Sequence, residues 1–206
     1  MITMAKLKEH NVLLEGETPK GRSIRLRPMT EDDWDILLKW NSDPEVLYYV
    51  EAANVTAHTL ELVQKIYRST SQNAFCFIIE LEGKPVGDCS LQKMNIERIL
   101  QKYPNLDCRR IGIMIGEKEY WGQGIGTEVI RLLTEFGFLK QGADMIFGAG
   151  VPDYNPRGLR AFQKVGYKIV AKIEERPGSK ANYIQDLALT RSEFLGKREK
   201  NSQADA

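Results

Sequence analysis

The stretch GQGIG at residues 122–126 constrains the fold more than any other part of this sequence. It lies between an apolar segment, 111–115, that predicts a buried strand, and a segment up to about 140 with apolar residues at helical spacing. Glycines at such a junction let successive backbone N–H groups point into one concavity. The helix N-terminus behind them adds a partial positive charge of about half a unit. The natural ligand of such a loop is a diphosphate.

Three features separate this loop from other phosphate-binding loops. It lacks the Gly-Lys-Ser/Thr ending that brings a lysine to a γ-phosphate. It follows an antiparallel hairpin, whereas a dinucleotide-binding fold normally opens with its glycine turn. Ile146 and Phe147 stand where an acidic residue would bind a ribose. An isolated glycine loop can also be a tight turn that binds no ligand. The position of this loop between a buried strand and a helix favours a diphosphate ligand.

The hydrophobic pattern predicts an α/β fold with a mixed, mostly antiparallel sheet and helices on both faces. The central pair, 111–115 and 143–149, must be parallel because a helix crosses between the two strands. The other predicted strands are 23–27, 75–81, 85–91, 167–173 and 183–189, and the other predicted helices cover 30–40, 56–67 and 155–165.

The chain of 206 residues is long enough for one core and short for two. We expect a flexible N-terminal arm at 1–21, one folded domain at 22–190 and a charged C-terminal tail at 191–206.

Composition narrows the classes of partner. With 29 basic and 28 acidic residues the net charge is +1, which favours neither nucleic acid nor an anionic membrane as a partner. No apolar run approaches the roughly 20 residues that span a bilayer. Three cysteines without paired spacing fit a reducing cytoplasm, and two histidines without a Cys-x-x-Cys motif predict no metal site.

Three segments together resemble the GCN5-related N-acetyltransferase (GNAT) superfamily: the strand 111–115, the loop WGQGIG at 121–126, and NPRGLRAFQKVGY at 155–167. Within it, the sequence is similar to aminoglycoside 6′-N-acetyltransferases and ribosomal-protein N-terminal acetyltransferases. YWGQGIGT at 120–127 and ILLKWNSDPEVL at 36–47 carry that closer similarity. The resemblance covers about residues 22–190.

The resemblance implies acetyl-CoA as co-substrate and no metal. Backbone amides of the glycine loop would bind its pyrophosphate, and its pantetheine arm would enter a gap where the two central strands splay apart. A backbone N–H of the strand could also polarise the thioester carbonyl. Asn155 would hold the arm, although a helix N-cap is an equally good interpretation. The implied cofactor-binding residues are Ile113, Met114, Ile115, Trp121, Gly122, Gln123, Gly124, Ile125, Gly126, Thr127 and Asn155.

The acid–base groups of the family are not matched. Many relatives carry a tyrosine that protonates the departing thiolate where this chain has Phe162, and aminoglycoside enzymes carry an aspartate where it has Gly112. The thiol pKa of about 8.5 lets water serve in place of the acid. An amine acceptor must still lose a proton. Asp88 and Glu117 are the candidate catalytic bases, with Glu119 as a third, and solvated carboxylates are the alternative interpretation of each.

The acceptor side remains open. Acidic residues at 32–51 could attract a polycation, or could belong to a capped helix with a solvated face. Tyr48 and Tyr49 could line a substrate cleft, and Trp40 could do so or pack in the core.

The sequence thus predicts a cytoplasmic N-acetyltransferase that moves an acetyl group from acetyl-CoA to a primary amine by direct attack in a ternary complex. No cysteine lies near the loop to form an acyl-enzyme. The acceptor would be a small molecule or a peptide, with an aminoglycoside, a peptide N-terminus and a polyamine all open, and a homodimer is compatible with the sequence. The alternatives are a non-catalytic acyl-CoA-binding or sensing module and, third, a nucleotide-binding fold.

Overall fold

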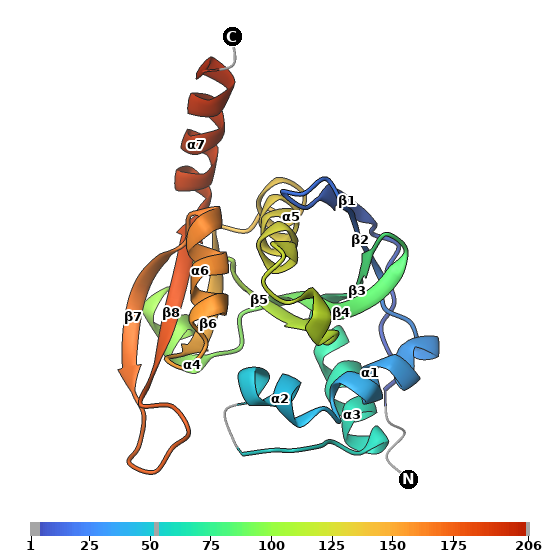
Figure 1. The fold of residues 1–206 in the computed structure, drawn as a ribbon. Helices are drawn as coiled ribbons and strands as arrows, with labels where there is room; N and C mark the ends of the chain where they lie inside the picture. The colour runs from blue at the N-terminus through green and yellow to red at the C-terminus, as the bar shows by residue number, and fades with distance from the viewer. Residues whose placement is uncertain (1–4, 52–53, 205–206) are drawn as a thin grey trace.

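The computed structural model describes residues 5–51 and 54–204 (Figure 1). Within them, one sheet has the strand order β1-β2-β3-β4-β5-β6-β8-β7. The strands are β1 (Leu14–Glu17), β2 (Ser23–Pro28), β3 (Ala74–Leu81), β4 (Lys84–Lys93), β5 (Cys108–Ile115), β6 (Met145–Pro152), β7 (Lys168–Glu174) and β8 (Tyr183–Thr190). The α-helices are α1 (Trp34–Trp40), α2 (Pro44–Val50), α3 (Leu60–Ser71), α4 (Glu97–Lys102), α5 (Ile125–Leu139), α6 (Pro156–Val165) and α7 (Arg191–Ala204).

The parallel pair β5–β6 is the centre of the sheet, and every other pair of neighbours is antiparallel. Its two strands pair at only three positions, Cys108 to Arg110 against Met145 to Phe147. They then diverge, so β5 has no strand partner on that side from Ile111 to Ile115. The predicted mixed sheet with a splayed parallel pair is confirmed.

Helices cover both faces of the sheet, as predicted (Figure 1). On one face the apolar sides of α5 and α6 pack on a core that includes Phe77, Ile79 and Leu91. On the other face α1, α2 and α3 bury Trp40, Val46 and Val63 against residues of β3 and β5. Among the described residues, no helix is long and apolar enough to cross a membrane.

The two terminal segments are more ordered than expected. The expectation of a flexible arm does not hold for residues 14–17, because β1 pairs with β2 and Leu14 packs against the core. In place of a loose tail, residues 191–204 form α7, which projects from the body in Figure 1. Phe194 anchors its first turn against Phe138, with ring centroids 5.1 Å apart.

Close packing between β4 and β5 predicts a large effect of one glycine substitution. Gly87 pairs with Ile115, and a Cβ at Gly87 would overlap the backbone carbonyl oxygen of Met114. The overlap can be relieved only if β4 and β5 move apart. Gly87→Ala should therefore lower the free energy of unfolding, measured in urea, by about 3 kcal/mol. The matched control is Gly196→Ala in α7, where no atom lies within 4 Å of the added Cβ. It should instead stabilise by up to about 1 kcal/mol, and equal effects of the two changes would contradict the packing argument.

Candidate active site

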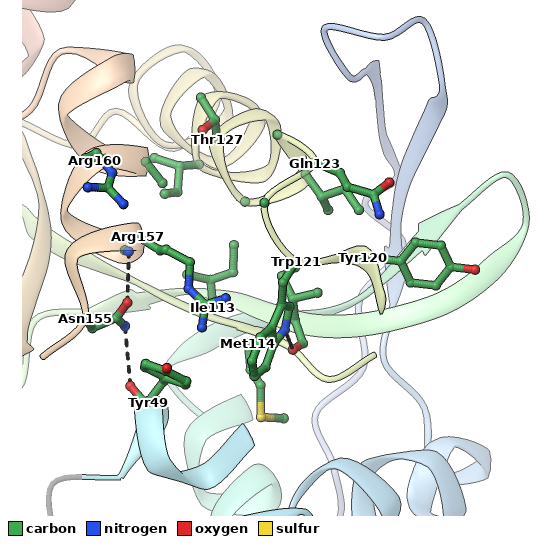
Figure 2. A pocket seen from close by; sticks show the side chains of 18 of the residues that line it. Tyr49, Ile113, Met114, Tyr120, Trp121, Gln123, Thr127, Asn155, Arg157 and Arg160 are labelled. Carbon is green, nitrogen blue, oxygen red and sulfur yellow. Dashed lines mark hydrogen bonds between the residues drawn. The ribbon is translucent and has the colours of Figure 1, made fainter. Parts of the chain in front are cut away.

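A cavity of about 440 Å³ opens where β5 and β6 diverge (Figure 2). Its walls come from the end of β5, the glycine loop with the first turn of α5, the start of α6, and α2. The lining residues are Val46, Tyr49, Val50, Ile113, Met114, Ile115, Tyr120, Trp121, Gly122, Gln123, Gly124, Ile125, Gly126, Thr127, Ile130, Asn155, Arg157, Gly158, Arg160, Ala161, Phe162 and Lys164.

The glycine loop forms one end of this cavity. Gly122 has φ 75° and Gly124, the N-cap of α5, has φ 87°. Both values lie in the left-handed region, where a side chain would strain the backbone. The turn therefore leads directly into α5, a helix of 15 residues whose first N–H groups have no intrahelical partner. These donors and the helix dipole make this end an anion-binding site.

On its β5 wall the cavity is lined by backbone that has no strand partner on the β6 side. Ile113, Met114 and Ile115 line it beyond the point where β6 leaves. The indole Nε1 of Trp121 donates a hydrogen bond of 2.7 Å to the carbonyl oxygen of Ile115. This bond fixes the Trp121 ring at the mouth of the gap, so the ring helps to shape the cavity.

Asn155 holds the start of α6 and links it to α2. Its Oδ1 accepts a hydrogen bond of 2.9 Å from the backbone N–H of Gly158, which is an N-cap contact. Its Nδ2 donates to the carbonyl oxygen of Tyr49 at 3.5 Å (Figure 2). The cap interpretation is therefore realised, and the residue also lines the cavity.

All eleven residues that the sequence assigned to cofactor binding line this one cavity. α6 presents to the same space a row of cations that was not predicted: Arg157, Arg160 and Lys164. Their spacing of three and four residues places them on one helical face, a signal that the sequence does contain. Tyr49 lines the cavity as expected, whereas Trp40 is fully buried in the core.

All three candidate bases stand outside the cavity lining, and Asp88 and Glu117 differ in environment. Asp88 lies on β4 opposite Met114 of β5, and it is buried rather than facing solvent. Burial raises the pKa of Asp88 to about 7, although the Tyr67 hydroxyl donates a hydrogen bond of 3.1 Å that opposes the shift. The amide of Asn41 in turn donates to the Tyr67 hydroxyl at 3.2 Å. A carboxyl group with this pKa can accept a proton near neutral pH.

Glu117 is held as an ordinary ionised carboxylate. Partial burial raises its pKa, but hydrogen bonds from Lys39 and from the indole of Trp40 outweigh burial, and the net pKa is lowered. Glu119 is exposed beside the loop. Of Asp88 and Glu117, it is Asp88 that has the raised pKa that suits a base.

Three of the acidic residues expected near the acceptor wall, Asp33, Asp43 and Glu45, form ion pairs with basic residues. Asp33 pairs with Arg27 at 2.6 Å, and Lys118 lies between Asp43 and Glu45 at 2.9 and 3.0 Å. No aspartate or glutamate lines the cavity as the described residues define it. Within the same part of the chain, no cluster of His, Cys, Asp or Glu could hold a metal ion.

The two positions where the family carries acid–base groups are occupied by inert residues. Phe162 is buried and its ring packs on Gly148, where a Cβ would collide with the ring. Gly112 is exposed on the sheet face, and its nearest neighbour on that side is the hydroxyl of Ser90. Neither residue can transfer a proton.

A splayed parallel pair beside a glycine loop and a helix N-terminus is an arrangement suited to a diphosphate-containing cofactor. The model of the acetyltransferase (GNAT) domain family matches residues 23–168. An uncharacterized N-acetyltransferase of Bacillus licheniformis is 25% identical over 162 residues, 73% of this chain and 84% of that protein. The spermidine N(1)-acetyltransferase of Escherichia coli is 20% identical over 157 residues, 75% of this chain and 78% of that protein.

Solved structures share the fold at low identity. An aminoglycoside acetyltransferase in complex with coenzyme A matches with a TM-score of 0.70 and 22% identity over 85% of this chain and 99% of that chain. RimJ of Mycobacterium smegmatis, in complex with CoA-disulfide, matches with a TM-score of 0.70 and 18% identity over 89% of each chain.

The chain belongs to the GNAT acetyltransferase family, because the family match spans most of its length. The resemblance inferred from the glycine loop is thereby confirmed. Membership makes the chain an acyltransferase of the acetyl-CoA-dependent class.

Proposed function

We propose that this protein transfers an acetyl group from acetyl-CoA to a primary amine by direct attack in a ternary complex. The observation that carries the proposal is the cavity itself. One end is a set of helix N–H groups without an intrahelical partner, and one wall is an edge of β5 that pairs with no strand and on which the Ile115 carbonyl accepts from Trp121. A diphosphate fits the end with the helix N–H groups, and an amide-containing arm fits the wall formed by the edge of β5.

The donor would be held mainly by main chain. The N–H groups from Gly122 to Thr127 would bind the pyrophosphate, and Arg160 and Lys164 face the same space with charge for further phosphate oxygens. The pantetheine arm would pair with the free edge of β5 at Ile113 to Ile115, where a backbone N–H could polarise the thioester carbonyl. Asn155 would contact the arm with the part of its amide that faces the cavity.

The acyl transfer itself needs little acid catalysis. The neutral amine nitrogen forms a bond to the thioester carbon, the C–S bond breaks, and the thiolate leaves, while the nitrogen releases one proton to water and becomes the amide nitrogen. A thiol pKa of about 8.5 makes this departure feasible near neutral pH with water as the proton donor. This accommodates Phe162, which has no hydroxyl.

The amine must first lose a proton, and we assign this step to Asp88, acting through water. Its pKa of about 7 suits a base at neutral pH, and it lies across from Met114, a cavity residue. Tyr67 would be a positioning residue, because its hydroxyl orients the carboxylate. The names of two similar proteins, an aminoglycoside acetyltransferase and a spermidine N(1)-acetyltransferase, support an amine acceptor.

Thiol release from acetyl-CoA tests the proposal. The full chain should bind acetyl-CoA by calorimetry and release thiol when a panel of primary amines is added, including kanamycin, spermidine, amino acids and short peptides. Tight binding without amine-dependent release would instead support the non-catalytic acyl-CoA-binding module, an alternative that Phe162 and Gly112 favour. Binding of ATP or NAD without binding of CoA would overturn both the acetyltransferase and the acyl-CoA-binding module.

A further inference from the structure

The cavity contains a guanidinium that has no carboxylate partner. Arg157 lies on the first turn of α6 with its charged group 4.6 Å from the Tyr49 ring centroid and 4.4 Å from that of Trp121. No carboxylate among residues 5–51 and 54–204 forms an ion pair with it. The two rings contact each other edge to face with centroids 5.5 Å apart, and the guanidinium packs against both. These contacts keep it in place while its N–H groups stay free for an anion.

The position of Arg157 separates it from the other cations of α6. In Figure 2 its side chain points toward Tyr49 and Trp121, whereas Arg160 lies one turn further along the helix, on the side of Thr127. The glycine loop and Arg160 thus share the phosphate end of the cavity. Arg157 lies at the α2 end, where Val46, Tyr49 and Val50 form the wall.

The charged residues at the α2 end of the cavity do not suit a polycationic acceptor. No acidic residue lines the cavity in the described parts of the chain, and the nearby acids Asp43, Glu45 and Glu51 have partners of their own. Outside the cavity lining, at the last position where β5 pairs with β6, Arg110 is a second guanidinium without a carboxylate partner among the described residues, and it donates a hydrogen bond to the neutral Gln92. It shares a sheet face with Gly112, since side chains two residues apart on a strand point the same way.

We infer that the α2 end of the cavity is an anion-binding subsite for the acceptor, and that the acceptor is a primary amine that carries a carboxylate. This inference rests on the proposed acetyl transfer. Arg157 binds the carboxylate with its free N–H groups, and the rings of Tyr49 and Trp121 contact the apolar part of the acceptor. A bidentate contact of this kind favours carboxylates over uncharged isosteres by charge and geometry together.

Matched pairs of amines that differ only in a carboxylate test the inference. Tyrosine is compared with tyramine, and a tripeptide amide with glutamate at its second position is compared with the glutamine version. In thiol release by the full chain, kcat/KM should be about tenfold or more higher for the carboxylate member of at least one pair. Equal rates within both pairs, or a clear preference for kanamycin or spermidine, would overturn the inference while leaving acetyl transfer intact.

Two variants on one helix distinguish the carboxylate of the acceptor from the phosphates of the donor. Arg157→Gln should abolish the preference within the pair and leave the KM for acetyl-CoA within about threefold. Arg160→Gln should keep the preference and raise the KM for acetyl-CoA, less so for acetyl-dephospho-CoA if it contacts the 3′-phosphate. A rise in the acetyl-CoA KM of Arg157→Gln with the preference retained would show that Arg157 binds the donor.

If no amine releases thiol, the proposed acetyl transfer fails, but the anion-binding subsite can still be tested by a binding measurement. With CoA bound, N-acetyltyrosine and N-acetyltyramine are titrated by calorimetry into wild type and Arg157→Gln. Tighter binding of N-acetyltyrosine that the variant loses supports the subsite. Equal affinity of the two compounds for the wild type overturns it.

Discussion

Asp88→Asn is expected to lower kcat/KM for acetyl transfer by about 10²–10⁴-fold, because the variant cannot accept the proton of the acceptor amine. The wild-type rate should rise with pH and level off above the pKa of about 7 that burial imposes on Asp88. The variant should lack this inflection. Rates are measured by thiol release from pH 5.5 to 9 at saturating acetyl-CoA.

The same substitution should stabilise the fold at alkaline pH. The folded-state pKa of Asp88 is raised from an unfolded value near 3.8. The folded protein therefore holds more protons between these values, and its stability falls as pH rises from about 4 to about 7. Asp88→Asn avoids the buried charge, so at pH 8 it should be more stable than wild type by on the order of 2–4 kcal/mol. The difference should shrink toward pH 4.

Two further variants keep this prediction specific. Glu117→Gln makes the same carboxyl-to-amide change at a group whose pKa is lowered in the fold. It should alter kcat/KM by less than threefold and should destabilise, not stabilise, at pH 8. Tyr67→Phe removes the hydrogen bond that lowers the pKa of Asp88, so the inflection should move to higher pH. A pH profile of Asp88→Asn that matches the wild type would exclude Asp88 as the base.

The donor half of the site could be predicted because it is local and made of backbone. Gly122 and Gly124 adopt left-handed backbone conformations. Glycine adopts them readily because it has no Cβ, so the residue type alone indicates a turn of this kind. The strand before them and the helix after them are adjacent in sequence, so the position of the anion site follows from a short segment. No long-range contact had to be known.

The acceptor half depends on contacts between distant segments. The aromatic contact of Arg157 joins α6 to Tyr49 of α2, and the Tyr67 hydroxyl joins α3 to Asp88 of β4. The hydrophobic pattern of either segment alone does not show which side chains meet. The spacing of Arg157, Arg160 and Lys164 in the sequence indicates that they share one face of α6. The sequence does not indicate which residues of other elements they contact.

Some elements that the hydrophobic pattern did not predict carry local signals of their own. Asp43 is the N-cap of α2 and accepts a hydrogen bond of 2.9 Å from the Glu45 N–H, and Pro44 is the first residue of that helix. Proline at the first helical position is favoured because its missing N–H would be unpaired anyway. Thr190 and Glu193 form a reciprocal cap at the start of α7 in the same way, within a tail expected to be loose.

The glycine loop permits the second large-effect prediction, the double substitution Gly122→Val and Gly124→Val. Both glycines have positive φ, where a β-branched residue costs about 1–2 kcal/mol or more at each position. The loop should relax out of this conformation, turn its N–H groups away from one another and place methyl groups where the diphosphate binds. The affinity for acetyl-CoA, measured by calorimetry, should fall by at least about 100-fold, since a lost donor set for an anion is worth roughly 3 kcal/mol.

The control variant in this loop is Gln123→Ala. The Gln123 side chain is engaged away from the anion site: its Oε1 accepts from Arg22 at 2.9 Å, and its Nε2 donates to the carbonyl oxygen of Glu119. Because the backbone N–H of residue 123 remains, the affinity for acetyl-CoA should change by less than about fivefold. Circular dichroism and urea unfolding would establish that both variants are folded. If the double valine variant is folded and binds acetyl-CoA as well as Gln123→Ala does, main-chain donors of this loop are not what holds the pyrophosphate.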